Sequence, residues 1–534
     1  MKKFISLMLV CVSVLLTTSC DSMDMLMSRV KTNIADIADD FTVDEGEKAT
    51  TQKIVDNSIN VGMTEFDTFN PLLTKSQSVK EVLQLIYEPL FEIDAAMHVV
   101  PVLASSYSVS PDGLTYNITM KKDVVWHDGK TLDAYDAAYT MKHILAGNTQ
   151  YSENLNDVAD YRAVSNDTLR IVLKHAVPQF TALLSFPIVK YQTPMDGKKD
   201  YFPVGTGAFE YKGKVDIDEY ILSAFGLYHN GRAKLDNIYI REAPDVERYR
   251  SMFEVSETDM ISGKMLDLMT YMPKGKSRMN DFISNYVTYV GFNLKNKLLA
   301  ENNTRTGLSN LIDKAGIVNS VLYSRGVATD VLVNPYSWLY YDLNTEFGAE
   351  REKAMQFFGN DGWGEDEDGY LKRTVNGKSE FLRLVMLVDE DNDIEYRIAL
   401  RIKEDLEKGG VKVVLDEQSH EMYNIKLQQG NYDVFISSCN LGTNHDVSKL
   451  VGLPYFSYSN NDVNMLISQL GMTSEDETVM DIYKQLGEIL KNDAPFVPLY
   501  YAKESVLVSA KIKNGTAPSL SGAFRVSNMW SVFE

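Results

Sequence analysis

The stretch VPVLASSYSVSPDGLTYNITMKKDVVWHDGKTLDAYDAAYT, residues 100–140, changes from strand to turn to helix patterns over a short distance. Its segment TYNITM (115–120) alternates polar and apolar side chains, which is typical of a strand with one buried face. Asp128 and Gly129 form a tight-turn dipeptide, because glycine adopts positive φ at no steric cost. The stretch therefore predicts short strands and helices in close succession.

The same stretch holds one histidine and three carboxylates, a set that acid/base or metal chemistry could use. Asp128 belongs to the predicted turn. Asp133 and Asp136 take the N-cap and N3 positions of the helix that follows, where they interact with its exposed N–H groups. A good cap is worth about 1 kcal/mol, which explains these residues without catalysis. His127 is then left without catalytic partners, and we predict no catalytic or metal site in this stretch.

The length and charge of the chain narrow its class. Its 534 residues exceed what one core usually holds, and 44% hydrophobic content supports globular folding in two or three domains or sub-domains. A net charge of −21 argues against nucleic-acid binding, which needs clustered Lys and Arg. The same charge argues against adhesion to anionic lipid through a basic face.

The N-terminus, MKKFISLMLVCVSVLLTTSC, has two lysines and then an apolar run that ends at Leu16. This run is too short to span a bilayer and is typical of a signal peptide, predicted over residues 1–19. The end of the run resembles a bacterial lipobox, in which Cys20 is lipidated and becomes the new N-terminus, although Leu16 lies four residues before the cysteine rather than three. The alternative is an ordinary secreted protein.

Residues 20–57 form a polar, acidic tether behind the proposed lipid. Apolar residues spaced by three and four within it predict either a marginal helix in a flexible leash or a short helix that self-associates or docks: Met23, Met27, Val30, Ile34, Ile37 and Phe41. Cys11 leaves with the signal peptide, so Cys439 is the one remaining free thiol and no disulfide forms within the mature chain.

The second half of the chain contains a strand–helix–strand unit. FLRLVMLVD (381–389) and VKVVLD (411–416) read as strands. Between them, RIALRIKEDLEKGG (397–410) has apolar residues four positions apart, which places them on one face of a helix, and a glycine pair ends the helix. NYDVFISS (431–438) adds a further strand, so the class is α/β or α+β with mixed sheets in more than one lobe.

Six segments, in this order, resemble the extracellular solute-binding proteins of the peptide/nickel type (family 5) that feed ABC importers. They are FNPLLTKSQSVKEVLQLIYEPLF (69–91), residues 100–140, PVGTGAFEY (203–211), YVGFNLKN (289–296), REKAMQFFGNDGWGEDEDGYLKR (351–373) and GEILKNDAPFVPLYY (487–501).

The resemblance implies an α/β fold of the periplasmic-binding-protein type (type II), a two-lobed clam shell with an extra sub-domain. Lobe one is expected over 58–289 with a C-terminal return over 497–534, and lobe two over 290–496. Two chain crossings would form a hinge, with the ligand in the cleft between the lobes. Hinge closure then works as a population shift that needs ligand contacts on both lobes.

The loop after strand 431–438 is the main candidate for ligand contact. In peptide-binding relatives a Trp follows this strand, and an Asp a few residues later pairs with the ligand's α-amino group. Here Cys439 stands in the Trp position and Asp446 is the acid of the loop, with Asn440 and His445 beside them. The alternative for Asp446 is a loop or helix-capping role before VSKLVG.

Lobe one offers further candidates in loops that leave strands. Phe66 and Asn70 follow the first strand, and Thr206 and Gly207 lie in the glycine loop, where backbone could approach a ligand closely. Core packing and tight turns explain the same residues without a ligand.

Metal and catalytic motifs are missing from the sequence. Seven histidines show no HxxxH or HExxH spacing, and there is no GxSxG, P-loop or CxxC motif. His445 beside Asp446 and Cys439 is the one cluster that a metal or metal-chelate could use. We predict neither a resident metal or cofactor nor an enzyme activity.

The sequence thus predicts a monomeric receptor, lipid-anchored on the extracytoplasmic face of a cell membrane. It would deliver a small solute, first of all a peptide, to an ABC permease. The alternatives are a signalling or scaffold lipoprotein with the same fold, and a receptor for a sugar or metal-chelate.

Overall fold

A computed structural model describes residues 57–147, 149–263, 276–343, 347–473, 475–513, 518–520, 522–524 and 527–532. The chain divides into two compact units, Met1–Lys53 and Ile54–Glu534, and all described residues belong to the second. The predicted signal peptide, Cys20 and the apolar stripe from Met23 to Phe41 lie outside the described residues. Among those described, none of the helices has the length and apolar character needed to cross a membrane.

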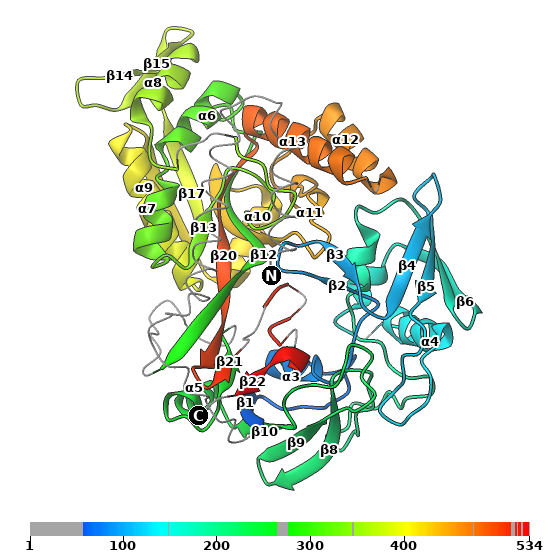
Figure 1. Cartoon of the computed structure of the whole chain (residues 1–534). Helices are drawn as coiled ribbons and strands as arrows, with labels where there is room; N and C mark the ends of the chain where they lie inside the picture. The colour runs from blue at the N-terminus through cyan, green and yellow to red at the C-terminus, as the bar shows by residue number, and fades with distance from the viewer. Residues whose placement is uncertain are drawn as a thin grey trace, which may run out of the picture. The chain divides into compact units, whose positions relative to one another are not determined.

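The largest sheet has eleven strands in the order β18-β17-β19-β12-β20-β11-β1-β10-β9-β8, with β13 paired to β20 (Figure 1). These strands are β1 Ser58–Thr64, β8 Phe209–Asp216, β9 Glu219–Ala224, β10 Asn237–Ala243, β11 Met260–Ser262, β12 Ser277–Phe292, β13 Gly326–Ala328, β17 Arg383–Asp389, β18 Lys412–Gln418, β19 Val434–Asn440 and β20 Phe496–Ser509.

Smaller sheets hold the remaining strands: β2 Phe91–Ile93, β3 Val99–Pro101, β4 Ala104–Val109, β5 Thr115–Met120, β6 Val158–Ser165, β7 Thr168–Leu173, β14 Gly364–Glu365, β15 Leu371–Val375, β16 Lys378–Phe381, β21 Ile512–Lys513 and β22 Ser531–Val532.

The α-helices are α3 Gln77–Leu83, α4 Ala134–Leu145, α5 Val246–Glu254, α6 Asn302–Leu311, α7 Lys314–Gly316, α8 Arg351–Asn360, α9 Asp393–Lys408, α10 His420–Gln429, α11 Ser448–Val451, α12 Asn461–Met472 and α13 Asp476–Asp493. Shorter 3₁₀ and π turns are η1 Ser152–Leu155, η2 Phe180–Leu184, η3 Ile317–Val321 and η4 Ser527–Met529.

The apolar side chains form separate cores at the two ends of the large sheet. One core collects residues between 59 and 282 and between 506 and 532, and we call the part around it lobe one. Two further cores collect residues between 283 and 501, and we call the part around them lobe two. The long strands β12 and β20 run antiparallel through both lobes, so the chain crosses between them twice (Figure 1). The predicted two-lobed α/β fold is confirmed.

Lobe two contains the predicted strand–helix–strand unit. β17 pairs in parallel with both β18 and β19, and α9 connects β17 to β18. Ile398, Ile402 and Leu406 are buried on one face of α9, as their spacing predicts. The helix begins four residues before the predicted segment, because the Asn392 side chain accepts a hydrogen bond from the Glu395 N–H and caps it.

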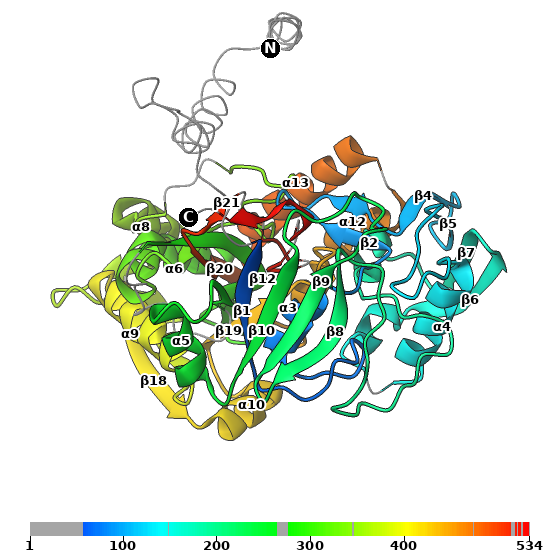
Figure 2. The ribbon, with the colours of Figure 1, turned by 60° about the horizontal axis from the view of Figure 1, so that its bottom comes forward.

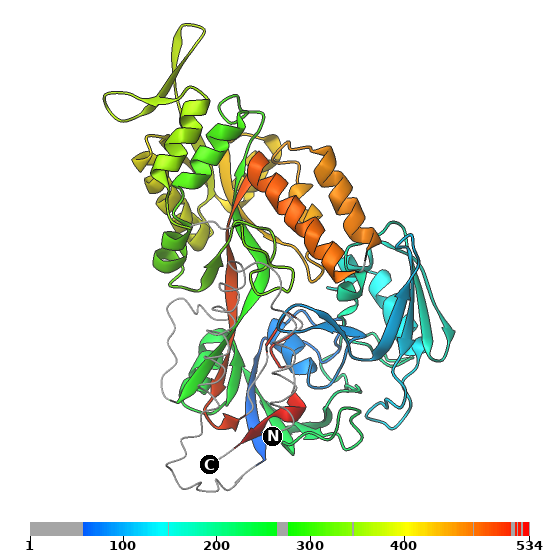
Figure 3. The same ribbon diagram turned by 45° about the horizontal axis from the view of Figure 1, so that its top comes forward.

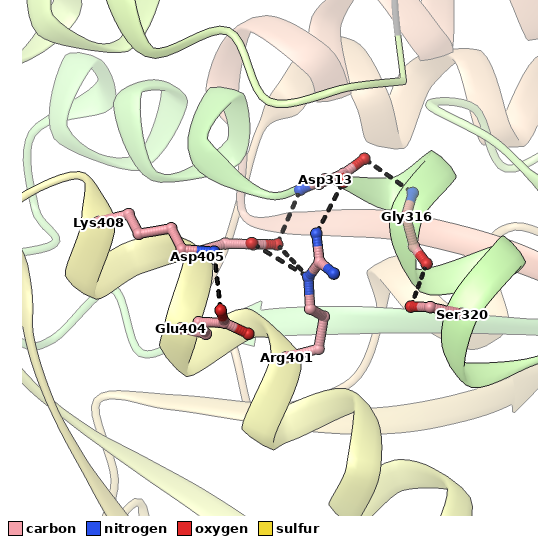
Figure 4. A network of polar contacts seen from close by, with 7 residues as sticks. All are labelled: Asp313, Gly316, Ser320, Arg401, Glu404, Asp405 and Lys408. Atoms are coloured by element: carbon pink, nitrogen blue, oxygen red, sulfur yellow. Dashed lines mark hydrogen bonds and ion pairs between the residues drawn. The ribbon is translucent and has the colours of Figure 1, made fainter.

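A polar network fixes α9 to the turn that follows α6 (Figure 4). Arg401 donates from Nη2 to Asp313 Oδ2 at 2.8 Å and from Nε to Asp405 Oδ1 at 3.1 Å. The second oxygen of Asp313 accepts from the Gly316 N–H at 2.7 Å. A planar guanidinium suits this bridge because it can donate to two carboxylates at once. The network therefore fixes the position of α9 relative to the turn after α6.

A four-stranded sheet, in the order β4-β5-β7-β6, and helix α4 form the sub-domain of lobe one (Figure 3). Asp133 and Asp136 take the predicted N-cap and N3 positions and form a capping box: Asp133 accepts from the Asp136 N–H, and the Asp136 carboxylate accepts from the Asp133 N–H. Asp136 also accepts from buried Trp126 Nε1 at 3.2 Å. The acids of the opening stretch therefore build the helix start, and Gly129 has the positive φ of 80° that its turn requires.

Strands β1, β10, β9 and β8 lie side by side as the lobe-one half of the large sheet (Figure 2). β1 is parallel to β10 and leads into the loop that holds Phe66 and Asn70. This half of the sheet, together with α3, supports the lobe-one loops nearest to the crossing strands.

Candidate functional site

The two crossing strands are interrupted where the chain passes from one lobe to the other. Ile283 pairs with Lys503, but the next paired residue of β12 is Val287, opposite Tyr501. Ser284, Asn285 and Tyr286 therefore form a bulge on β12. A bulge leaves ladder groups unpaired and bends the strand, so it is a suitable place for a hinge.

The loop after β19 is attached to this bulge. The Asn285 side chain donates from Nδ2 to the carbonyl oxygen of Gly442, and the Leu441 N–H donates to the Asn285 carbonyl at 3.1 Å. Asn440 is the last paired residue of β19 and lies opposite Tyr286. The loop that the sequence singled out for ligand contact therefore lies at the hinge.

The same loop also contacts lobe one. The Thr443 hydroxyl donates to the Ala182 carbonyl at 3.0 Å, and Asn444 Nδ2 donates to the Pro178 carbonyl at 3.1 Å. A second contact joins the lobes elsewhere, because the Trp338 N–H donates to the Ala96 carbonyl at 2.9 Å. We call the contact of the 443–444 loop and the contact of Trp338 the inter-lobe seam.

Asp446 has local partners in its own loop. Its Oδ1 accepts from the Ser448 N–H at 3.0 Å and from the Ser448 hydroxyl at 2.5 Å. Its own N–H donates to the Leu441 carbonyl at 2.9 Å. The carboxylate therefore orders the turn that leads into α11, the loop role that the sequence left open beside ligand binding.

His445 lies inside the protein, with 1% of its surface exposed and a φ of 49°. Its carbonyl accepts from the Tyr483 hydroxyl at 2.8 Å, while neither ring nitrogen has a hydrogen-bond partner among the described residues. Burial lowers the pKa of the imidazole to about 4, so the ring is neutral at physiological pH.

Cys439 and Asn440 end β19 at the hinge. Cys439 is half-buried, and burial raises the pKa of its thiol to about 11, which keeps it protonated and unreactive. The Asn440 side chain is exposed, with Oδ1 accepting from the Gly442 N–H at 2.9 Å. Of the predicted loop residues, Asn440 presents the most surface to solvent.

The lobe-one candidates after β1 lie within the lobe. The Phe66 ring packs 4.7 Å from that of Phe69 and 5.5 Å from that of Tyr220. Asn70 is fully buried, and its Nδ2 donates to the Pro194 carbonyl at 3.2 Å while Oδ1 accepts from the Leu72 N–H. Both residues thus have the packing and turn roles that the sequence also allowed.

Thr206 and Gly207 belong to a buried polar cluster around Glu88. The Thr206 hydroxyl donates to Glu88 Oε2 at 2.9 Å, and the Tyr228 hydroxyl donates to Oε1 at the same distance. His229 Nε2 lies 3.0 Å from both carboxylate oxygens. Gly207 has no room for a Cβ against the backbone of residues 85 and 86. A glycine is therefore required at position 207, because the backbone of residues 85 and 86 packs directly against it.

His127 also has a structural role that the sequence did not reveal. Its Nδ1 accepts from the Gly205 N–H at 3.3 Å and its Nε2 lies 3.0 Å from the Gly207 carbonyl. The imidazole joins the family-like turn at 126–130 to the glycine loop. His127 thus holds two loops together.

Two cavities near buried charged groups each lie within a single lobe. The one in lobe one, about 320 Å³, is bordered by Glu88, Tyr228 and Gly207. The one in lobe two, about 360 Å³, is bordered by the buried pair of Lys314 and Asp330. The boundary between the lobes is marked by the hinge, the seam and the ends of the lobe-two strands.

The sequence analysis missed one group at the carboxyl ends of the lobe-two strands. The parallel strands β17 and β18 and the adjacent β19 all end toward the hinge, and ligands of open α/β sheets bind at such carboxyl ends. Glu395, at the start of α9, accepts from the Ser438 hydroxyl of β19 at 2.9 Å. The run of acids directly after β17, DEDNDIE (389–395), was the signal that could have found it.

A metal site is not evident in the part of the chain that the structure describes. No group of three or more His, Cys, Asp or Glu side chains has an arrangement that could hold an ion there. His445, Asp446 and Cys439 lie close in sequence without forming such a group.

Comparison with known proteins gives one consistent result. A sequence profile of the bacterial extracellular solute-binding proteins, family 5, matches residues 98–461. The oligopeptide-binding protein AppA of Bacillus subtilis (strain 168) is 23% identical over 496 residues, covering 86% of this chain and 89% of AppA. The nickel-binding periplasmic protein of Escherichia coli K12 is 23% identical over 505 residues, covering 86% and 90%.

Solved structures share the fold. A nickel ABC transporter protein from Bacillus halodurans superposes with a TM-score of 0.76 at 18% identity, covering 89% of this chain and 100% of its own. AppA of Bacillus subtilis in complex with a nonapeptide gives 0.59 at 21% identity, covering 89% and 99%.

Proposed function

Because this chain belongs to family 5 of the bacterial extracellular solute-binding proteins, we propose that it captures a peptide between its two lobes and delivers it to an ABC importer. Members of this family bind solutes and are not enzymes, so the protein acts by binding. The profile match over residues 98–461 carries the proposal, since it spans most of both lobes.

The place of capture is the crevice at the hinge. The bulge at 284–286 and the loop at 440–446 are joined by hydrogen bonds, and β17, β18 and β19 end beside them. A ligand held here contacts both lobes, which is the condition for stabilising a closed state. The permease would then recognise the closed arrangement.

A peptide is the solute that the relatives favour. The dipeptide-binding protein of Escherichia coli K12 aligns with 80% of this chain, and AppA has been solved with a nonapeptide. Relatives named for transport also disfavour a signalling or scaffold role without transport. Asp446 and Asn440 remain our candidates for polar contacts to the peptide, because their loop lies at the hinge.

The membrane anchor belongs to the same proposal. A lipid on Cys20 would hold a monomer on the extracytoplasmic face, with residues 20–57 as the tether.

Titration with peptide pools tests the function. Purified mature protein is mixed with di- to pentapeptide pools, and the melting temperature and tryptophan fluorescence are recorded. Binding of at least one pool, with a raised melting temperature and no turnover of the peptide, is the expected result. A flat response to every pool would contradict peptide capture, and hydrolysis of peptides would contradict a pure binding role.

A further inference from the structure

The edge of lobe two that faces the hinge carries an acidic segment. Residues 389–395, DEDNDIE, run from the last residue of β17 into the first turn of α9. The carboxyl ends of β17 and β18 lie at this edge, the usual position of a ligand on an open α/β sheet. The charge of this segment could therefore determine which peptide side chains are bound at this edge.

Most acids of the segment are bonded to groups of lobe two. Asp389 Oδ2 lies 2.6 Å from His420 Nδ1, and Asp391 accepts from the His420 N–H at 2.8 Å. Asp393 forms an ion pair with Arg397 at 3.2 Å. These contacts complete the ends of α9 and α10 and need no ligand.

Glu395 differs from them. Its N–H is capped by Asn392, yet its carboxylate does not return to the cap as in a capping box. The carboxylate instead reaches across to β19, where the Ser438 hydroxyl donates to Oε1 at 2.9 Å. Glu395 is therefore directed at the end of the sheet rather than at its own helix.

Three elements meet at this carboxylate. Ser438 Oγ lies 2.9 Å from Thr288 Oγ1 of β12, and Thr288 is the second residue after the hinge bulge. Ser438 is exposed, so this chain of hydroxyls opens to solvent at the hinge side of the sheet. The row of Thr288, Ser438 and Glu395 is a polar edge fixed on α9, β19 and β12.

The carboxylate is poorly solvated, and among the described residues it forms no ion pair. Burial raises the pKa of Glu395 to about 7, with nearby Asp389 adding to the shift and His420 opposing it. Its hydrogen bond comes from a neutral serine, and β12, β19 and β20 present neutral hydroxyls around it: Thr288, Ser438 and Tyr500. A ligand cation would supply a charge-assisted bond, which the described residues do not give this carboxylate.

Aromatic side chains border the same place. Tyr500 lies opposite Thr288 in the pairing of β12 with β20, and the Tyr423 hydroxyl donates to the carbonyl of Ile436, two residues before Ser438 on β19, at 2.6 Å. Aromatic rings beside a carboxylate favour the stem and head of a lysine or arginine side chain. The net charge of −21 adds long-range attraction for such ligands.

We propose that Glu395, held by Ser438 and Thr288, is a specificity-determining residue that binds a lysine or arginine side chain of the captured peptide. The receptor accordingly selects basic peptides over neutral and acidic ones of the same length. This inference rests on the proposed function and narrows its substrate class.

Calorimetry on the full mature chain tests the proposal with three peptide pools that differ at one position, Ala-X-Ala and Ala-Ala-X-Ala-Ala with X as Lys, Gln or Glu. The Lys pool is expected to bind at least about tenfold more tightly than the Gln pool, and the Glu pool most weakly. Glu395→Gln is expected to weaken Lys-pool binding about 10- to 100-fold while leaving the Gln pool within about twofold. The isosteric amide keeps an acceptor for Ser438, so the fold is retained.

Glu390→Gln is the matched control, since it removes an exposed acid of the same segment and is expected to change neither pool. Between pH 6 and pH 8, Lys-pool affinity of the wild type should rise about tenfold as Glu395 ionises, and Glu395→Gln should remove this rise. Equal binding of the Lys and Gln pools, or unchanged selectivity in Glu395→Gln, would overturn this inference alone. No binding of any pool would overturn the proposed function and this inference with it.

Discussion

Asp446 provides the sharpest single-residue test of the peptide site. Its Oδ1 accepts from Ser448, a role that an asparagine oxygen can take over. The substitution Asp446→Asn therefore removes the charge while keeping the local hydrogen bonds. We expect the free energy of unfolding to change by no more than about 0.5 kcal/mol, as for substitutions away from buried features.

The expected effect on binding follows from the charge. If Asp446 pairs with the α-amino group of the peptide, the lost hydrogen bond between charged groups is worth about 1.5–3 kcal/mol. At about 1.4 kcal/mol for each factor of ten, affinity falls by about 10- to 150-fold.

A double-mutant cycle isolates this pair. Calorimetry compares wild type and Asp446→Asn, each with one peptide and with its N-acetylated form, which lacks the ammonium group. Acetylation should weaken binding to the wild type strongly and to the variant little. Unchanged affinity of Asp446→Asn for the free peptide would remove Asp446 from the site and leave its role as the local partner of Ser448.

Three further predictions concern the scaffold and the anchor. Gly205→Ala would place a Cβ against the backbone carbonyl of Ile86, so we expect the free energy of unfolding, measured with denaturant, to fall by about 3 kcal/mol. Gly129→Ala, in open space at positive φ, is expected to cost about 1 kcal/mol. Equal costs would contradict the close approach of Gly205 to Ile86. Burial lowers the pKa of His445 from its usual 6.5 to about 4, because the folded protein favours the neutral imidazole. The contribution of this group to the free energy of unfolding is therefore complete above pH 6.5 and is lost as the pH falls toward 4. Wild type should lose about 2 kcal/mol more than His445→Asn between pH 7.5 and pH 5.0, and parallel losses would contradict this. Cys20→Ala should move the protein from the membrane to the soluble fraction, and continued membrane attachment would refute lipidation of Cys20.

Local patterns in the sequence predicted the elements of the fold well. The capping box of Asp133 and Asp136 and the apolar face of α9 depend on residues within one or two turns, and both are present. The family resemblance then supplied what local patterns cannot, namely the two lobes and the two crossings. The bulge at 284–286 had no visible signal, because it arises from the register between two strands that are distant in sequence.

The candidate site was predicted in part. The loop after β19 lies at the hinge, as a ligand-contact loop should, but Asn70 and Thr206 lie inside lobe one. Their partners, Pro194 and Glu88, are more than 100 residues away in the chain, so spacing alone could not reveal them. Glu395 was missed because the sequence does not show its contact with Ser438, and this contact distinguishes it from the other acids of its segment.

The central claim is that a peptide is captured between two lobes that close on a hinge. Small-angle X-ray scattering of the mature protein, with and without a saturating peptide pool found by calorimetry, measures that closure directly. The account predicts a smaller radius of gyration with peptide bound, because both lobes then contact the ligand. Saturating binding with an unchanged radius of gyration would contradict capture by closure.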